Sequence, residues 1–73
     1  MEMNKKMLGQ RLREAREKRG LTAAQAARRS EMPNHQLLAY EKGRVLPRLD
    51  TLMRLATVLE ADITEILSDA LDG

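Results

Sequence analysis

The sequence predicts an all-α protein in which five short helices form a single domain. Three observations support this fold class. Apolar residues recur at helical spacing along most of the chain. Only two prolines and four glycines interrupt its 73 residues. The residues available for a core are aliphatic, because Tyr40 is the only aromatic side chain, and aliphatic residues suit helices that pack on helices.

The first helix is predicted over residues 5–19. Leu8, Leu12 and Ala15 recur at i, i+4 and i+7, which places them on one side of a helix, and charged residues occupy the other sides. Gly20 follows as the residue that ends the helix, because glycine readily adopts the left-handed conformation found just after a helix.

The second helix is predicted over residues 23–29. Thr22 and Gln25 have the spacing of a capping box, in which each side chain bonds to the backbone N–H of the other residue. The buried side of this helix offers only Ala26 and Ala27. Small side chains of this kind require the helix to lie close to its neighbours.

A short break at residues 30–33 precedes the third helix, which is predicted over residues 34–42. Pro33 is tolerated at its start and Gly43 closes it. Its two sides differ in composition: Leu37, Tyr40 and Glu41 lie on one side, and Asn34, His35, Leu38 and Ala39 lie largely on the other.

A basic turn over residues 43–48 leads to two further amphipathic helices. The fourth is marked by apolar residues at helical spacing, namely Leu49, Leu52, Ala56 and Leu59. The fifth is predicted over about residues 62–71, and Asp62 and Glu65 repeat the spacing of a capping box at its start. Its apolar positions are Ile63, Ile66, Leu67, Ala70 and Leu71.

Cysteine content and hydropathy predict a soluble cytoplasmic protein. The chain contains no cysteine, which excludes a disulfide framework and a thiolate metal site and favours a reducing compartment. No apolar run approaches the ~20 residues of a membrane span. The N-terminus lacks the apolar stretch of a signal peptide.

Charge is distributed unevenly, although the net charge is only +2. Residues 1–48 carry twelve Lys and Arg against five Asp and Glu, whereas residues 49–73 carry one Arg against six acidic residues. Blocks of opposite sign indicate a basic face for a polyanion and an acidic face elsewhere. The alternative is that these are simply the solvated surfaces of charged helices. A single aromatic residue cannot form the stacking platform that recognition of single-stranded nucleic acids usually needs.

From about Leu8 to Leu67, the chain resembles the phage-repressor-like helix-turn-helix family (Cro/C1 type, XRE). The matching residues are Arg16, Gly20-Leu21-Thr22, Ala27, Leu37, Tyr40-Glu41, Gly43-Arg44, Pro47, Leu49 and Leu52. The resemblance implies a compact five-helix lambda-repressor-like DNA-binding domain, with the motif at about residues 22–42. The second helix of the motif would lie in the major groove, and the first would cross the DNA backbone. It also implies a prokaryotic or phage protein that acts on the nucleoid.

Site residues follow from this resemblance by position. Lys42, Arg44 and Arg48 would contact phosphates, and Arg16 and Glu41 would form a structural pair. Base-facing positions and the residues beside them are Asn34, His35, Gln36, Leu38 and Ala39. The alternative for Asn34 and His35 is that they only solvate the first turn of a helix, and the alternative for the cations is a solvated loop.

Three residues depart from the family pattern. Ala23 replaces the usual glutamine at the start of the second helix, and Ala26 replaces the usual leucine. Glu31 replaces a glycine in the turn that is commonly left-handed, a conformation that costs another residue about 1 kcal/mol. These substitutions preserve the predicted fold and bear on DNA affinity.

Enzymatic chemistry finds no support in the sequence. His35 has no evident nucleophile beside it, Ser30 and Ser68 lack a neighbouring base, and no glycine-rich phosphate loop is present. His35 with Glu31 gives two possible metal ligands, which are too few for a site. No metal, cofactor or small-molecule substrate is therefore expected.

The sequence is interpreted as that of a transcriptional regulator, a repressor that binds double-stranded DNA as a homodimer on an inverted repeat. Ile63, Ile66, Leu67 and Leu71 of the last helix are predicted to form the dimer contact. The alternative is a protein-interaction module that keeps the fold but reads DNA weakly or not at all, for which Ala23, Glu31 and Leu38 are the evidence.

Overall fold

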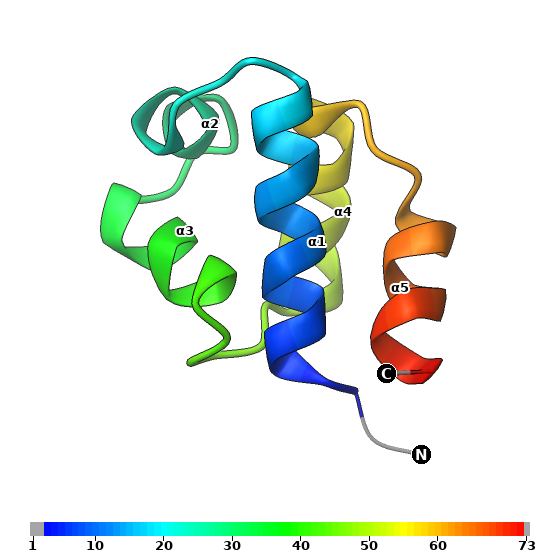
Figure 1. Cartoon of the computed structure of the whole chain (residues 1–73). Coiled ribbons are helices and arrows are strands. Elements are labelled where there is room, and N and C mark those ends of the chain that lie inside the picture. The colour runs from blue at the N-terminus through cyan, green and yellow to red at the C-terminus, as the bar shows by residue number, and fades with distance from the viewer. Residues whose placement is uncertain (1–2, 73) are drawn as a thin grey trace.

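The computed structural model describes residues 3–72, and the regular secondary structure of this part of the chain consists of α-helices joined by short loops (Figure 1). The helices are α1 (Lys5–Lys18), α2 (Ala23–Arg29), α3 (Asn34–Glu41), α4 (Leu49–Leu59) and α5 (Ile63–Asp72). The five-helix prediction is confirmed, and each predicted boundary lies within one or two residues of the observed one. None of the helices in the described range is both long enough and apolar enough to cross a membrane.

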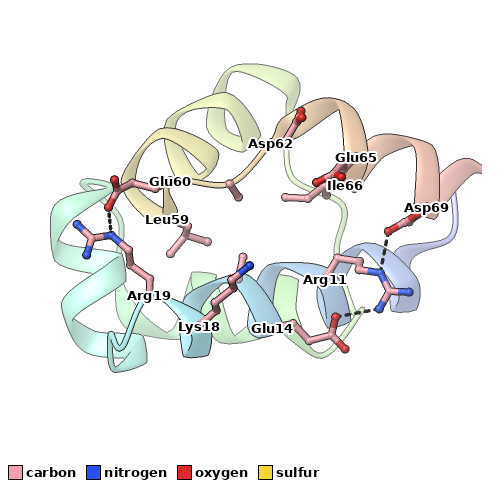
Figure 2. Close-up of a pocket in the computed structure, with 12 residues that line it drawn as sticks. Arg11, Glu14, Lys18, Arg19, Leu59, Glu60, Asp62, Glu65, Ile66 and Asp69 are labelled. Carbon is pink, nitrogen blue, oxygen red and sulfur yellow. Dashed lines mark hydrogen bonds and ion pairs between the residues drawn. The ribbon is translucent and has the colours of Figure 1, made fainter.

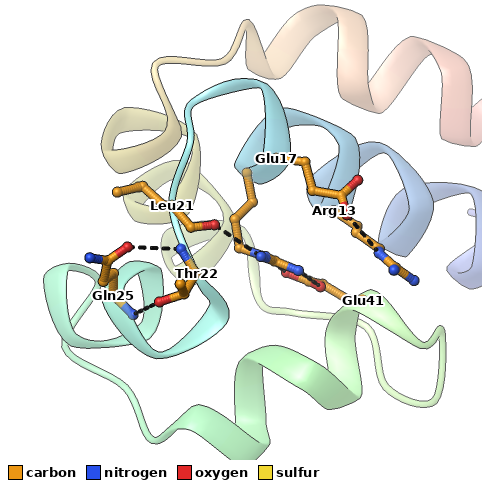
Figure 3. Close-up of polar contacts among 7 residues, drawn as sticks. Arg13, Glu17, Leu21, Thr22, Gln25 and Glu41 are labelled. Carbon is orange, nitrogen blue, oxygen red and sulfur yellow. Dashed lines mark hydrogen bonds and ion pairs between the residues drawn. The ribbon is translucent and has the colours of Figure 1, made fainter.

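Side-chain caps fix the starts of several helices. The Thr22–Gln25 box is complete: the Gln25 N–H donates to Thr22 Oγ1 over 3.1 Å and the Thr22 N–H donates to Gln25 Oε1 over 2.9 Å (Figure 3). Asn4, which the sequence analysis did not single out, accepts a bond from the Met7 N–H at the start of α1. At α5, Asp62 Oδ1 accepts from the Thr64 N–H rather than from the Glu65 N–H, and within residues 3–72 the Glu65 carboxylate accepts no bond from the Asp62 N–H. Asp62 therefore caps the helix, but the predicted box with Glu65 does not form.

The helices are arranged around α1. In Figure 1, α2 and α3 lie on one side of α1 and α5 lies on the other, with α4 behind. Helix α1 packs against α3, α4 and α5, and α2 packs against α3 and α4. The core is aliphatic with one tyrosine, and its largest fully buried apolar side chains are Leu8, Leu12, Leu37, Leu52 and Leu55.

The apolar side of α4 differs from the prediction at its first residue. Leu49 was expected on the core stripe, but its side chain is 61% exposed. The stripe instead consists of Leu52, Leu55, Ala56 and Leu59, which is an i, i+3, i+4, i+7 pattern that begins one turn later. Leu49 is the first residue of α4 and lies beyond the edge of the core.

Helix α3 crosses α1 at Gly9. A Cβ atom at this position would collide with the backbone carbonyl oxygens of Tyr40 and Glu41, lying 2.5 Å from that of Glu41. Gly9 is buried within α1 and therefore allows the backbone of α1 to approach the C-terminal end of α3 directly. This contact places the end of α3 closer to α1 than any other residue would permit.

An ion pair holds the same two helices together. Arg16 Nε donates to Glu41 Oε2 over 2.6 Å and Arg16 Nη2 donates to Glu41 Oε1 over 2.9 Å, so the contact is bidentate (Figure 3). Arg16 Nη1 also donates to the Leu21 carbonyl over 3.0 Å. The side chains of Arg16 and Glu41 are only 12% and 4% exposed. Its hydrogen bonds to Glu41 raise the pKa of Arg16 above its ordinary value, although burial opposes this shift.

We expect Arg16→Ala and Glu41→Ala each to lower the free energy of unfolding by about 3 kcal/mol, because either change leaves the other charge buried without its partner. The double variant should lose much less than the sum of the two. Urea or thermal unfolding of the three variants measures this coupling. Arg13→Ala is the matched control, since the Arg13–Glu17 pair is exposed and its loss should cost under about 0.5 kcal/mol. Additive losses at Arg16 and Glu41 would contradict the coupling.

Candidate nucleic-acid interface

Helix α3 divides its residues between the core and the solvent. Leu37 and Tyr40 are buried, whereas Asn34 and His35 are exposed in its first turn. Leu38 and Ala39 are half-buried. This is the division that the sequence predicted, and it leaves Asn34 and His35 free to contact a partner.

Gln36 has a partner within the domain. Its Nε2 donates to the Tyr40 hydroxyl over 2.7 Å, and its side chain is half-buried. Gln36 was predicted beside the base-facing positions, and the structure places it where it orients the tyrosine of the same helix.

The basic turn after α3 presents three exposed cations. Lys42, Arg44 and Arg48 are all exposed, and neither Lys42 nor Arg44 has an ion-pair partner among residues 3–72. Arg48 Nε lies 3.6 Å from Asp50 Oδ1, but both side chains remain largely in solvent. A surface pair of this kind is weak, so Arg48 remains available to another anion.

This turn lies against the start of α1. Gly43 has a positive φ of 73°, and a Cβ there would lie 2.8 Å from the Lys6 Cα atom. Lys5 and Arg44 line a common hollow of about 510 Å³. The structure thus adds Lys5 and Lys6 to the basic side of the molecule. They were part of the predicted basic block of residues 1–48 but not of the predicted phosphate contacts, because only the folded chain brings residues 5 and 44 together.

Two further exposed arginines, Arg28 and Arg29, lie in the last turn of α2, next to the turn of the motif. Neither was in the predicted set, and neither forms an ion pair in the described part of the chain. Their signal in the sequence was the Arg-Arg pair at the end of the second predicted helix.

The turn between α2 and α3 contains a left-handed glutamate. Glu31 has φ of 58°, as the resemblance predicted for this position. Its carboxylate lies 3.9 Å from Arg54 Nη1 of α4 and its side chain is 79% exposed. Glu60, between α4 and α5, has the same conformation with φ of 52°, and its carboxylate pairs with Arg19. Both glutamates therefore combine a left-handed backbone with an ion pair to an arginine of another segment.

Several acidic residues gather on the opposite side of α1 from α3. A groove of about 590 Å³ runs between α1 and the segment from the end of α4 through α5 (Figure 2). Two ion pairs bridge it, Arg19–Glu60 and Arg11–Asp69, the latter at 2.9 Å. Its charged lining residues are Arg11, Lys18 and Arg19 against Glu14, Glu60, Asp62, Glu65 and Asp69. The groove is thus a mixed surface in which carboxylates outnumber cations, and it lies on the other side of α1 from α3.

The predicted dimer residues are mostly used within the single chain. Ile66 is 6% exposed and belongs to the core, and Ile63 and Leu67 are half-buried against it. Only Leu71 is exposed, at 39%. Among residues 3–72, the other exposed large apolar side chains are Val45, Leu46, Leu49 and Met53.

Comparison with known proteins assigns the chain to a family. The model of the helix-turn-helix domain matches residues 7–68. The HTH-type transcriptional regulator ImmR of Bacillus subtilis (strain 168) is 37% identical over 60 residues, which make up 82% of this chain and 47% of ImmR. This chain therefore spans about half the length of that relative.

Solved structures of regulators have the same fold. Two structures of the clp gene regulator ClgR from Corynebacterium glutamicum each align with a TM-score of 0.87 and 25% identity, over 97% of this chain and over 91% and 76% of those chains. The restriction-modification controller protein C.AhdI from Aeromonas hydrophila aligns with a TM-score of 0.79 and 31% identity, over 84% and 92% of the two chains. The prediction of a protein that is not an enzyme is confirmed by these relatives. The chain belongs to the helix-turn-helix domain family, of the phage-repressor-like (Cro/C1, XRE) type, whose members are DNA-binding regulators of transcription.

Proposed function

We propose that this chain represses transcription by binding, as a homodimer, to an inverted repeat in double-stranded DNA. The observation that carries the proposal is the surface of α3 and the turn after it. Asn34 and His35 are exposed at the start of the helix, and the exposed cations Lys42 and Arg44 follow its end without a carboxylate partner in the described chain. Polar side chains for base edges and cations for phosphates are therefore presented by one short segment.

The two groups of residues have different roles in this proposal. With α3 in the major groove, the Asn34 amide can bond to the N6 and N7 atoms of an adenine, and His35 can donate or accept at a base edge. Lys42, Arg44 and Arg48 contact phosphates, which positions the domain without reading the sequence.

A gel-shift assay with DNA from the region upstream of the chain's own gene, over a series of salt concentrations, tests the function. A specific complex that weakens as salt rises supports it. The alternative of a protein-interaction module predicts no specific shift at any salt concentration. A promoter–reporter fusion carrying the same DNA then tests repression, because a repressor lowers the reporter signal when it is expressed.

Arg44→Ala should weaken binding to specific and random DNA about equally. Each phosphate contact releases counterions, so the slope of log K against log salt should become shallower by roughly 0.9 when one contact is lost. Arg13→Ala on the exposed side of α1 is the control and should leave the slope unchanged. An unchanged slope in Arg44→Ala would remove this residue from the phosphate contacts.

Asn34→Ala should weaken the cognate complex by about 1–3 kcal/mol while leaving binding to random DNA nearly unchanged, because it removes a base contact and no phosphate contact. Fluorescence anisotropy with both DNAs measures the difference. Gln10→Ala, an exposed amide on α1, should change neither affinity. Equal losses on both DNAs would show that Asn34 does not read bases.

For the dimer, support comes from the size and charge of the domain. Its extents are 32 × 21 × 19 Å, so two copies joined end to end can place their α3 helices at about the ~34 Å spacing of one DNA turn. A dimer contact through α5 keeps the carboxylates that line the groove between α1 and α5 away from DNA. Leu71 is the apolar side chain of α5 that is exposed for such a contact, with the half-buried Leu67 one turn before it.

Leu71→Asp should therefore give a folded monomer that binds a single half-site weakly. Ile66→Asp is unsuitable for this test, because Ile66 is buried in the core and its replacement would unfold the domain. Analytical ultracentrifugation at micromolar concentration compares the wild type with Leu71→Asp and with the control Leu49→Asp on α4. A wild type that sediments as a monomer would sink the dimer proposal, and a dimeric Leu71→Asp would move the contact away from α5.

A further inference from the structure

The solvent side of α3 has an apolar centre between polar ends. Asn34, Leu38 and Lys42 follow one another at intervals of four residues, so they form one stripe along the helix and the residue after it. Asn34 and Lys42 are exposed, and Leu38 between them is half-buried. On the neighbouring stripe, Ala39 follows the exposed His35 in the same way.

This apolar centre is only about one side chain wide. Leu38 is flanked along its stripe by an amide and an ammonium group, and Ala39 beside it is small. The strongly exposed apolar side chains of the described chain lie elsewhere, in the segment from Val45 to Met53 and at Leu71. A protein partner would need a broader apolar patch than Leu38 provides.

The major groove of DNA offers one apolar feature of matching size. Among the four bases, only thymine presents a methyl group there, at C5, and most other groups at the base edges are hydrogen-bond donors and acceptors. Leu38 lies one helical turn, about 6 Å, from Asn34 along α3. This distance corresponds to about two base-pair steps.

We propose that Leu38 packs against the C5 methyl group of a thymine in the operator, about two base pairs from the base that Asn34 reads. The proposal rests on the function proposed above, and it specifies the base chemistry that α3 recognises. The partly buried position of Leu38 supports it, because a side chain already restrained by its neighbours loses little conformational freedom on contact. The half-site then contains an A·T pair at each of the two positions.

The experiment replaces thymine with deoxyuridine, which removes the methyl group and leaves the hydrogen-bonding edge intact. An operator is first selected from a random duplex pool with the wild-type protein, and each thymine of the half-site is then replaced in turn. At one position the wild-type affinity should fall about fourfold, the effect of exposing one methyl-sized apolar group.

Two variants and one control assign the methyl contact to Leu38. Leu38→Ala should bind the thymine and deoxyuridine operators equally, since the packing partner of the methyl is gone. Leu38→Gln has a side chain of similar length, and glutamine is also a good helix former. This variant should likewise bind both operators equally, and thermal melting verifies that each variant is folded. Leu49→Ala removes an exposed leucine outside α3 and should keep the fourfold ratio.

Three results would overturn the inference. A wild type that binds all deoxyuridine operators as tightly as the thymine operator does not contact a methyl group. Discrimination that persists in folded Leu38→Ala and Leu38→Gln belongs to another residue. Failure of the wild type to select or shift any duplex would overturn the proposed function together with this inference, whereas the first two results leave the proposed function standing.

Discussion

The bidentate contact between Arg16 and Glu41 is the interaction on which the geometry of the motif depends. One guanidinium group binds the carboxylate at the end of α3 and the Leu21 carbonyl just before α2, so α1 holds both helices of the motif. Five N–H donors in a fixed plane make this possible, and a lysine could not reproduce it. The domain thus fixes the angle between α2 and α3 from outside the motif, and the turn between them need not be rigid by itself.

Gly9 adds a steric requirement to this polar one. Because a side chain at this position would meet the carbonyl oxygens of Tyr40 and Glu41, the backbones of α1 and α3 are in direct contact. Glu41 therefore reaches Arg16 from a helix that is already held close, which explains how two charged groups are buried with good hydrogen-bond geometry. The outward side of α3 is oriented by the same contacts. Asn34 and Leu38 face away from the core because Leu37 and Tyr40 on the same helix face α1 and its neighbours.

Helix positions and the motif were predictable from the sequence because they depend on local patterns. Apolar spacing predicted the helices, and Thr22 with Gln25 marked the start of α2. The exposure of Leu49 was not predictable, since periodicity alone cannot tell where the core ends along a helix. The closeness of Lys5 to Arg44 and the contact of Gln36 with Tyr40 depend on tertiary packing and on side-chain orientation. The burial of Ile66 was not predictable either, because the apolar side of a helix can pack on the core of its own domain or on a partner.

The two left-handed glutamates link backbone conformation to the distribution of charge. A glycine at either position would relieve about 1 kcal/mol of strain. Each glutamate instead brings a carboxylate to an arginine elsewhere in the fold, Glu31 to Arg54 in α4 and Glu60 to Arg19 just after α1. Because both ion pairs are exposed, each recovers only part of that strain energy. The two glutamates differ in where they place their negative charge. Glu60 places its charge at the groove between α1 and α5, where it would add to a field that turns the basic side toward DNA in the proposed complex. Glu31 places its charge three residues before Asn34, where it would oppose binding of phosphates in the proposed complex. Its contact with Arg54 draws that charge toward α4 and away from the start of α3.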